Sequence, residues 1–277
     1  MSKNLIGSAL DVLFFSAVYT VLVVIRTIIS PVTGVGLSYL SVGTSFLGGL
    51  VFACFLAWMV SKMELRKLDV SLTLWFTLFI IQHLSNTIEG YFFTTYYSST
   101  LTVVISLLVA SASTFVESIM AVFLFYKERN KTRLLPVLSD FFKKRRPGSW
   151  LWRIVAASLA YLPIYFLFGM MISPFIIPYY SSSTALKIPS FTVILPLEFI
   201  RGFIYTVVLV PIISSVKISR RTLFVILASF LYIPGAFLNL IVPGSLPTGI
   251  LPFHLLEILG DSIVYGYVLA RLLGRPR

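Results

Sequence analysis

The sequence has few of the residues on which most enzymes depend. Only 12% of its 277 residues are charged, and it contains one cysteine and two histidines. A single thiol, Cys54, cannot form an internal disulfide, and no cysteine cluster is present that could hold zinc or an iron–sulfur centre. Two histidines are too few for the multi-histidine iron sites of membrane desaturases. No P-loop, His-Glu-x-x-His or Gly-x-Ser-x-Gly pattern occurs, so the sequence predicts no cofactor and identifies no reaction.

Apolar residues, in contrast, make up 58% of the chain, and its mean hydropathy is +0.96. Soluble domains carry roughly 25% charged residues, and one soluble core cannot hide this much apolar surface. A helix that spans a bilayer needs about 20 mostly apolar residues. We therefore expect an all-α integral membrane protein of about eight transmembrane helices, near residues 9–30, 43–61, 69–89, 99–126, 151–173, 190–213, 222–242 and 251–273.

The basic residues are concentrated in alternate loops and at both chain ends. These regions hold 19 of the 22 Lys and Arg residues: Lys3, Lys62, Arg66, Lys67, Lys127, Arg129, Lys131, Arg133, Lys143, Lys144, Arg145, Arg146, Arg153, Lys217, Arg220, Arg221, Arg271, Arg275 and Arg277. The positive-inside rule then predicts a multi-pass protein with both termini in the cytoplasm, in a plasma membrane of the prokaryotic type. The net charge of +12 follows from this topology. The lipid bilayer, and not nucleic acid, is the expected partner.

The loop at residues 127–150 divides the chain into two halves, 1–126 and 151–277, each with four predicted spans. Its two basic clusters flank an apolar stretch at 134–142. This stretch fits a short interfacial helix whose Lys and Arg neighbours bind anionic lipid headgroups. It fits equally well a plain tether between the halves.

The two halves share a rough pattern that indicates a duplication. Ile-Ser-Pro occurs at 29–31 and again at 172–174, and Asn86 and Asn239 occupy similar places in the third and seventh spans. Glu117-Ser118-Ile119 and Asp261-Ser262-Ile263 lie in the fourth and eighth spans. Short matches also arise by chance in apolar sequence. If they are homologous, the chain consists of two parallel four-helix repeats related by an axis along the membrane normal.

Ionisable side chains inside the predicted spans are the candidate functional residues. Each costs about 2.5–3.5 kcal/mol at the bilayer centre on insertion scales, so it needs a reason to be there. The spacing of His254, Glu257 and Asp261 places all three on one helical face, which must point into the bundle or a wet cavity. That face is either a proton or substrate site or, for His254 and Glu257, a set of hydrogen bonds to neighbouring helices.

Two other spans carry polar pairs. Glu198 and Arg201 are three residues apart, so they can neutralise each other within one helix, or Arg201 can bind an anionic group or Asp261. Asn86 shares a face with Glu89, and this face is expected to line the bundle interior near its outer end. Helix breakers at Pro196, Pro211 and Pro234-Gly235 are typical of binding sites in transporters and of simple packing kinks.

Three functions are compatible with these features. The leading interpretation is a carrier-like protein that binds or moves a small solute or lipid-like molecule at a charged central site, which is not an enzymatic activity. Its predicted site residues are Asn86, Glu117, Glu198, Arg201, His254, Glu257 and Asp261. The alternatives are an intramembrane metal-assisted hydrolase that uses His83, His254, Glu257 and Glu89, and a non-catalytic membrane subunit or sensor whose buried charges only join helices.

Overall fold

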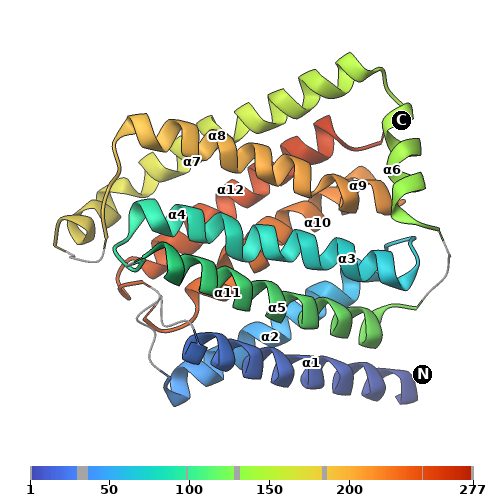
Figure 1. Cartoon of the computed structure of the whole chain (residues 1–277), viewed down its shortest axis with the longest axis horizontal. Coiled ribbons are helices and arrows are strands. Elements are labelled where there is room, and N and C mark those ends of the chain that lie inside the picture. The colour runs from blue at the N-terminus through green and yellow to red at the C-terminus, as the bar shows by residue number, and fades with distance from the viewer. Residues whose placement is uncertain are drawn as a thin grey trace.

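The computed structural model describes residues 2–29, 37–97, 99–127, 132–182, 186–244 and 246–275, with the side chains of 7–29 and 132–180 included in the first and fourth ranges. Nearly all of these residues are helical, as predicted for the fold class. The extended pairings among them are two isolated bridges, Met63–Val216 and Thr94–Leu186. Figure 1 shows the helices gathered into a bundle, with both termini at one end of it.

Eight helical segments among the described residues are long and apolar enough to cross a membrane, which confirms the predicted number. Three of the eight are each built from more than one helical element, and helix α6 (Leu134–Lys143) lies between the fourth and fifth segments. In chain order the eight are α1 (Ser2–Ile29); α2 (Tyr39–Val60); α3 (Lys67–Leu78) with η2 (Phe79–Leu84) and α4 (Ser85–Phe93); α5 (Thr100–Phe125); α7 (Pro147–Ser182); α8 (Phe191–Val208) with α9 (Val210–Ser215); α10 (Arg220–Tyr232) with η3 (Ile233–Phe237) and α11 (Leu238–Leu240); and α12 (Leu251–Leu272).

Large apolar side chains cover the outside of the bundle. Leu108, Phe123, Met170 and Leu256 are all more than 60% exposed, although each lies within an apolar helix. Many buried positions, in contrast, are polar, including Glu117, which is 1% exposed. The core still contains many apolar residues, but an exterior of large apolar side chains around buried charges fits a bundle whose outer surface faces hydrocarbon.

Helix α7 runs nine residues past the predicted end of the fifth span. The apolar run predicts a span that ends at residue 173, but α7 continues through Pro174 and Pro178 to Ser182. A proline lacks the N–H that would bond the carbonyl four residues earlier. The hydroxyl of Ser173 donates to the carbonyl oxygen of Met170 at 2.9 Å and so supplies part of the missing bonding. The helix therefore persists towards the loop before α8.

The third and seventh segments are held together by two reciprocal hydrogen bonds. Both segments contain a π-helical stretch, η2 and η3, and these stretches are in contact. Asn86 Nδ2 donates to the carbonyl oxygen of Gly235 at 2.7 Å, while Asn239 Nδ2 donates to that of Gln82 at 3.1 Å. The π-helical geometry leaves backbone carbonyls available for such bonds. The predicted interruption at Pro234-Gly235 is thus present, but no feature of the sequence predicted η2, which contains no proline.

One end of the bundle, here called the basic end, holds both termini, α6 and the connection between α2 and α3 (Figure 1). The stretch at 134–142 is helical there, and Phe141 of α6 packs on Trp150 with 4.8 Å between ring centroids. Arg145 and Arg153 both donate to the carbonyl oxygen of Leu272, at 3.1 and 2.9 Å, and so cap the last turn of α12. Residues 128–131 of the predicted linker lie outside the described residues.

Candidate functional site

A cavity of about 640 Å³ lies inside the bundle, between the two halves of the chain. Its walls come from α1, η2, α4, α5, α7, α8, η3, α11 and α12, and residues 94–97 and 186–189 line it at the end opposite the basic end, here called the distal end. This volume falls within the range of roughly 300–1,000 Å³ found for small-molecule sites. The wall is mostly apolar and aromatic, with a few convergent charged groups.

Arg201 of α8 is the centre of the first charged group. Its Nη1 donates to Glu198 Oε2 at 2.9 Å, and its Nη2 donates to Glu89 Oε2 at 2.8 Å. Nη2 also donates to the Tyr205 hydroxyl at 3.2 Å, and Nε to the Ser85 hydroxyl at 3.4 Å. The guanidinium group is therefore saturated by two carboxylates and two hydroxyls. Arg201 is 6% exposed and Glu198 is fully buried, so this is an interior ion pair and not a surface one.

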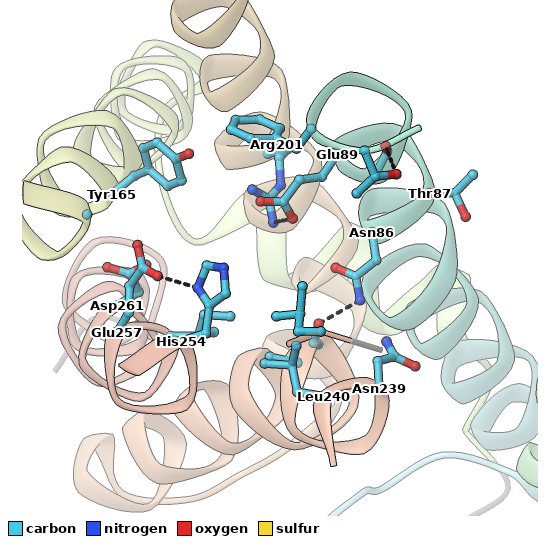
Figure 2. Close-up of a pocket in the computed structure, with 18 of the residues that line it drawn as sticks. Asn86, Thr87, Glu89, Tyr165, Arg201, Asn239, Leu240, His254, Glu257 and Asp261 are labelled. Carbon is cyan, nitrogen blue, oxygen red and sulfur yellow. Dashed lines mark hydrogen bonds and ion pairs between the residues drawn. The ribbon is translucent and has the colours of Figure 1, made fainter. Parts of the chain in front are cut away.

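The second charged group comes from α12. His254 Nδ1 donates to Glu257 Oε2 at 2.6 Å, and the wall opposite is Gly169 of α7, whose Cβ position lies 3.5 Å from Glu257 Oε1. Asp261, one turn further along, is 6% exposed, and its Oδ1 has no hydrogen-bond partner among the described residues. Figure 2 shows these α12 side chains on one side of the cavity, with Arg201 and Glu89 across it.

Several charged and titratable groups from four elements surround Asp261. Their combined formal charge is strongly negative, since one arginine faces several acids. They are Glu257 and His254 of α12, Arg201 and Glu198 of α8, Glu89 of α4, and Tyr161 and Tyr165 of α7.

Tyrosines form the floor of the cavity beneath Arg201. The ring of Tyr161 packs edge-on against Tyr205 and Tyr265, with centroid distances of 5.5 and 4.9 Å, and lies 5.8 Å from the Arg201 guanidinium carbon. Gly202 permits this packing, because a Cβ atom there would lie 2.7 Å from the Tyr161 Cβ. The polar groups are thus set on a rigid aromatic base.

A third charged group lies on the first-half side of the cavity. Arg26 Nη1 donates to His83 Nε2 at 2.7 Å and lies 3.8 Å from Glu117 Oε1. Gln82 is buried beside it, and neither its Nε2 nor its Oε1 has a hydrogen-bond partner within the described ranges. Arg26, like Arg201, is therefore already engaged by groups of the protein itself.

Comparisons with protein-family models, curated proteins and solved structures find no match to this chain. The site must therefore be interpreted from its own chemistry.

Five of the seven predicted site residues line this one cavity, and the other two lie directly behind its wall. Those in the wall are Asn86, Arg201, His254, Glu257 and Asp261. Glu198 lies behind the wall against Arg201, and Glu117 lies behind it against Arg26. Arg201 was expected to pair either with Glu198 of its own helix or with an anionic group or Asp261, and in the structure it pairs with Glu198.

Sequence reasoning missed several residues of the site. Arg26 was not among the predicted site residues, and Glu89 was named only on the Asn86 face and in the hydrolase alternative, but both side chains turn inward to charged partners on other helices. It also passed over Tyr161 and Tyr165, although their four-residue spacing on α7 puts them on one face. Tyrosines in an apolar run are ordinarily interpreted as core or interfacial residues, so no sequence signal set them apart.

The metal-assisted hydrolase hypothesis requires several metal donors at one point. In the part of the chain that the structure describes, no group of three or more His, Cys, Asp and Glu side chains is placed to hold a metal ion. His83 bonds to Arg26, and His254 bonds to Glu257. The donor set of that hypothesis is therefore not assembled there.

Proposed function

We propose that this chain is a multi-pass membrane protein that binds a small solute in its interior cavity and carries it across the bilayer. One observation supports this most strongly: Asp261 lines a cavity of about 640 Å³ and makes no ion pair among the described residues, whereas the other buried charges around the cavity are paired. Charges that only join helices would be expected to pair fully, because an unpaired buried carboxylate is costly. Asp261 Oδ1 is buried and has no hydrogen-bond partner among the described residues.

The orientation follows from the basic end. With its Lys and Arg residues on the cytoplasmic side, as the positive-inside rule requires, both termini are cytoplasmic and the cavity lies towards the outer surface. Solute would enter past residues 94–97 and 186–189 at the distal end. Helix α6 would lie at the inner leaflet, where the exposed Leu135 contacts acyl chains and Lys143 and Lys144 bind anionic headgroups.

We further propose that the two halves are parallel repeats. The reciprocal bonds of Asn86 and Asn239 support this, because Asn239 follows Asn86 by 153 residues and Gly235 follows Gln82 by the same interval. Asn86 therefore bonds to Gly235, and Asn239 bonds to Gln82, the residue at the corresponding position of the other half. Such an exchange of equivalent contacts is expected across a two-fold axis.

Similar ring contacts occur inside each half, although the interval of 153 residues holds for only one ring of each pair, since Tyr161 follows Tyr19 by 142. Tyr19 of α1 packs edge-on against Phe52 of α2 at 5.7 Å, and Tyr161 of α7 packs edge-on against Tyr205 of α8 at 5.5 Å. Tyr205 follows Phe52 by 153 residues. Helix α1 also packs on α2 and α5 as α7 packs on α8 and α12. The Ile-Ser-Pro match at 29–31 lies partly outside the described residues, so it adds nothing here.

Parallel repeats with the site between them are typical of several transporter folds, in which the halves move against each other around the bound solute. Under this arrangement Asp261 and Glu117 are counterparts. Glu117 lies behind the wall beside Arg26, whereas Asp261 lines the cavity, so solute binding is assigned to the second half.

Blocking the cavity tests the carrier proposal. We expect Gly169→Leu to abolish uptake, because a side chain at Gly169 projects towards Glu257. Purified protein in proteoliposomes would be assayed for uptake of a panel of cationic, anionic, zwitterionic and neutral solutes, with and without a pH gradient. The matched control is Gly43→Leu, an exposed position with nothing within 4 Å of its Cβ. Protein-dependent uptake that survives Gly169→Leu would contradict the proposal.

A further inference from the structure

Both arginines that line the cavity already bond to groups of the protein, and this argues against an anionic solute. Arg201 donates to two carboxylates and two hydroxyls, and Arg26 donates to His83 and lies beside Glu117. An anion would have to displace a carboxylate from a buried arginine to bind either group. Such displacement leaves a buried charge unpaired and is unfavourable.

The acceptor oxygens of α12, in contrast, are available. Asp261 lines the cavity, and its buried Oδ1 has no hydrogen-bond partner among the described residues. Among the described residues Glu257 accepts a hydrogen bond from His254 at Oε2, and its Oε1 faces Gly169, a lining position with no side chain. The two other carboxylates near Asp261, those of Glu198 and Glu89, both pair with Arg201. A positive charge is what this wall lacks.

The cavity surface beside these oxygens is aromatic. Tyr165 of α7, a helix that packs on α12, lies on the same side of the cavity as Glu257 and Asp261 (Figure 2). Tyr96, Tyr97 and Tyr180 line the wall towards the distal end. Aromatic faces attract organic cations through their quadrupoles, and they also cover the apolar body of such a molecule.

A bare inorganic ion suits the site poorly. Hard divalent cations such as calcium take six or more oxygen ligands, and the described residues offer no group of even three acidic, histidine or cysteine side chains placed for a metal. One or two carboxylates with aromatic neighbours are sufficient for an ammonium group, whose charge is spread over its substituents.

We infer that the solute is an organic cation, an amine or quaternary ammonium compound with an apolar body, bound by Asp261 and Glu257 against the ring of Tyr165. This inference rests on the proposed carrier function and names its substrate class.

Binding of benzyltrimethylammonium to the purified protein tests the inference. Radiolabelled cation would be measured against wild type, Asp261→Asn, and the exposed control Asp140→Asn on α6. We expect saturable binding to wild type and to Asp140→Asn, and a loss of roughly tenfold or more in affinity for Asp261→Asn, because a charge-assisted contact is removed. The thermal unfolding midpoint of each variant in the same detergent shows whether it is folded.

Tyr165 variants separate an aromatic contact from a general effect on the cavity. Tyr165→Leu should weaken cation binding roughly 3- to 30-fold, whereas Tyr165→Phe, which keeps the ring, should bind within about twofold of wild type. Equal losses in both variants would overturn the role assigned to the ring.

Competition with matched solutes distinguishes the inference from the function on which it rests. Benzoate and the neutral isostere neopentylbenzene should fail to displace the labelled cation. If an anion or a neutral compound is taken up in the cavity assay and Asp261→Asn leaves its binding unchanged, the cation assignment is wrong and the carrier function stands. If no solute of any charge binds in a manner sensitive to Gly169→Leu, both are wrong.

Discussion

Replacing Arg201 with methionine is expected to lower the free energy of unfolding by about 3–5 kcal/mol. The substitution leaves Glu198, which is fully buried, without its 2.9 Å partner, and it also frees Glu89. A buried charge without a partner is far more costly than an intact pair or than no charge at all. Chemical denaturation in detergent micelles, followed by tyrosine and tryptophan fluorescence, would measure the change.

A double substitution tells whether the loss arises from the orphaned carboxylate. Arg201→Met combined with Glu198→Leu should recover much of the stability, because neither member of the pair is then left charged and unpaired. The control is Lys217→Met, which breaks an exposed ion pair with Glu64 of 2.5 Å and should cost no more than about 1 kcal/mol. Equal destabilisation by Arg201→Met and Lys217→Met would contradict the interior placement of Arg201.

Asp261→Asn is expected to have the opposite profile, with uptake lost and stability retained or raised. Asp261 has no ion pair and an unpartnered Oδ1 among the described residues, so neutralising it removes an electrostatic cost of folding without breaking a contact. If the carboxylate binds the solute, uptake should fall by at least about tenfold. Such a gain in stability at the expense of activity is a frequent property of binding-site residues.

Uptake and stability of the Asp261→Asn variant must be compared with each other. The protein would be assayed for uptake in proteoliposomes and for unfolding in detergent, with Asp140→Asn, on the exposed side of α6, unchanged in both. A variant that unfolds more easily and transports at the wild-type rate would make Asp261 a structural group. That outcome would favour the non-catalytic subunit or sensor over the carrier.

The helices could be predicted because their signal is local. Runs of about 20 apolar residues identify spans whatever surrounds them, and the eight predicted segments match the eight observed ones closely. The face formed by His254, Glu257 and Asp261 was also predictable, since their spacing fixes their direction on any α-helix. The end of α7 was not, because the Ser173 hydroxyl bonds to a carbonyl that Pro174 leaves free.

Partners on other helices could not be predicted, since they depend on tertiary packing. Glu89 bonds to Arg201 more than a hundred positions away, and Arg26 reaches His83 and Glu117 on two other segments. A sequence pattern shows that a buried charge needs a partner and does not say which one. For the reciprocal bonds of Asn86 and Asn239, the sequence showed only that the two residues have similar positions in the two halves.

The central claim is that the charged interior is an accessible cavity and not a set of closely packed ion pairs. The reactivity of a cysteine placed in the cavity wall measures this most directly. Gly169→Cys would be made in a Cys54→Ser background, because Cys54 is exposed, together with Ala53→Cys in the packed core, where Ala53 is 0% exposed. We expect a trimethylammonium-bearing methanethiosulfonate reagent, added outside intact cells, to label the cysteine at position 169 rapidly and the one at position 53 only after unfolding. If the two cysteines are equally protected in the folded protein, there is no accessible cavity and the proposed function is wrong.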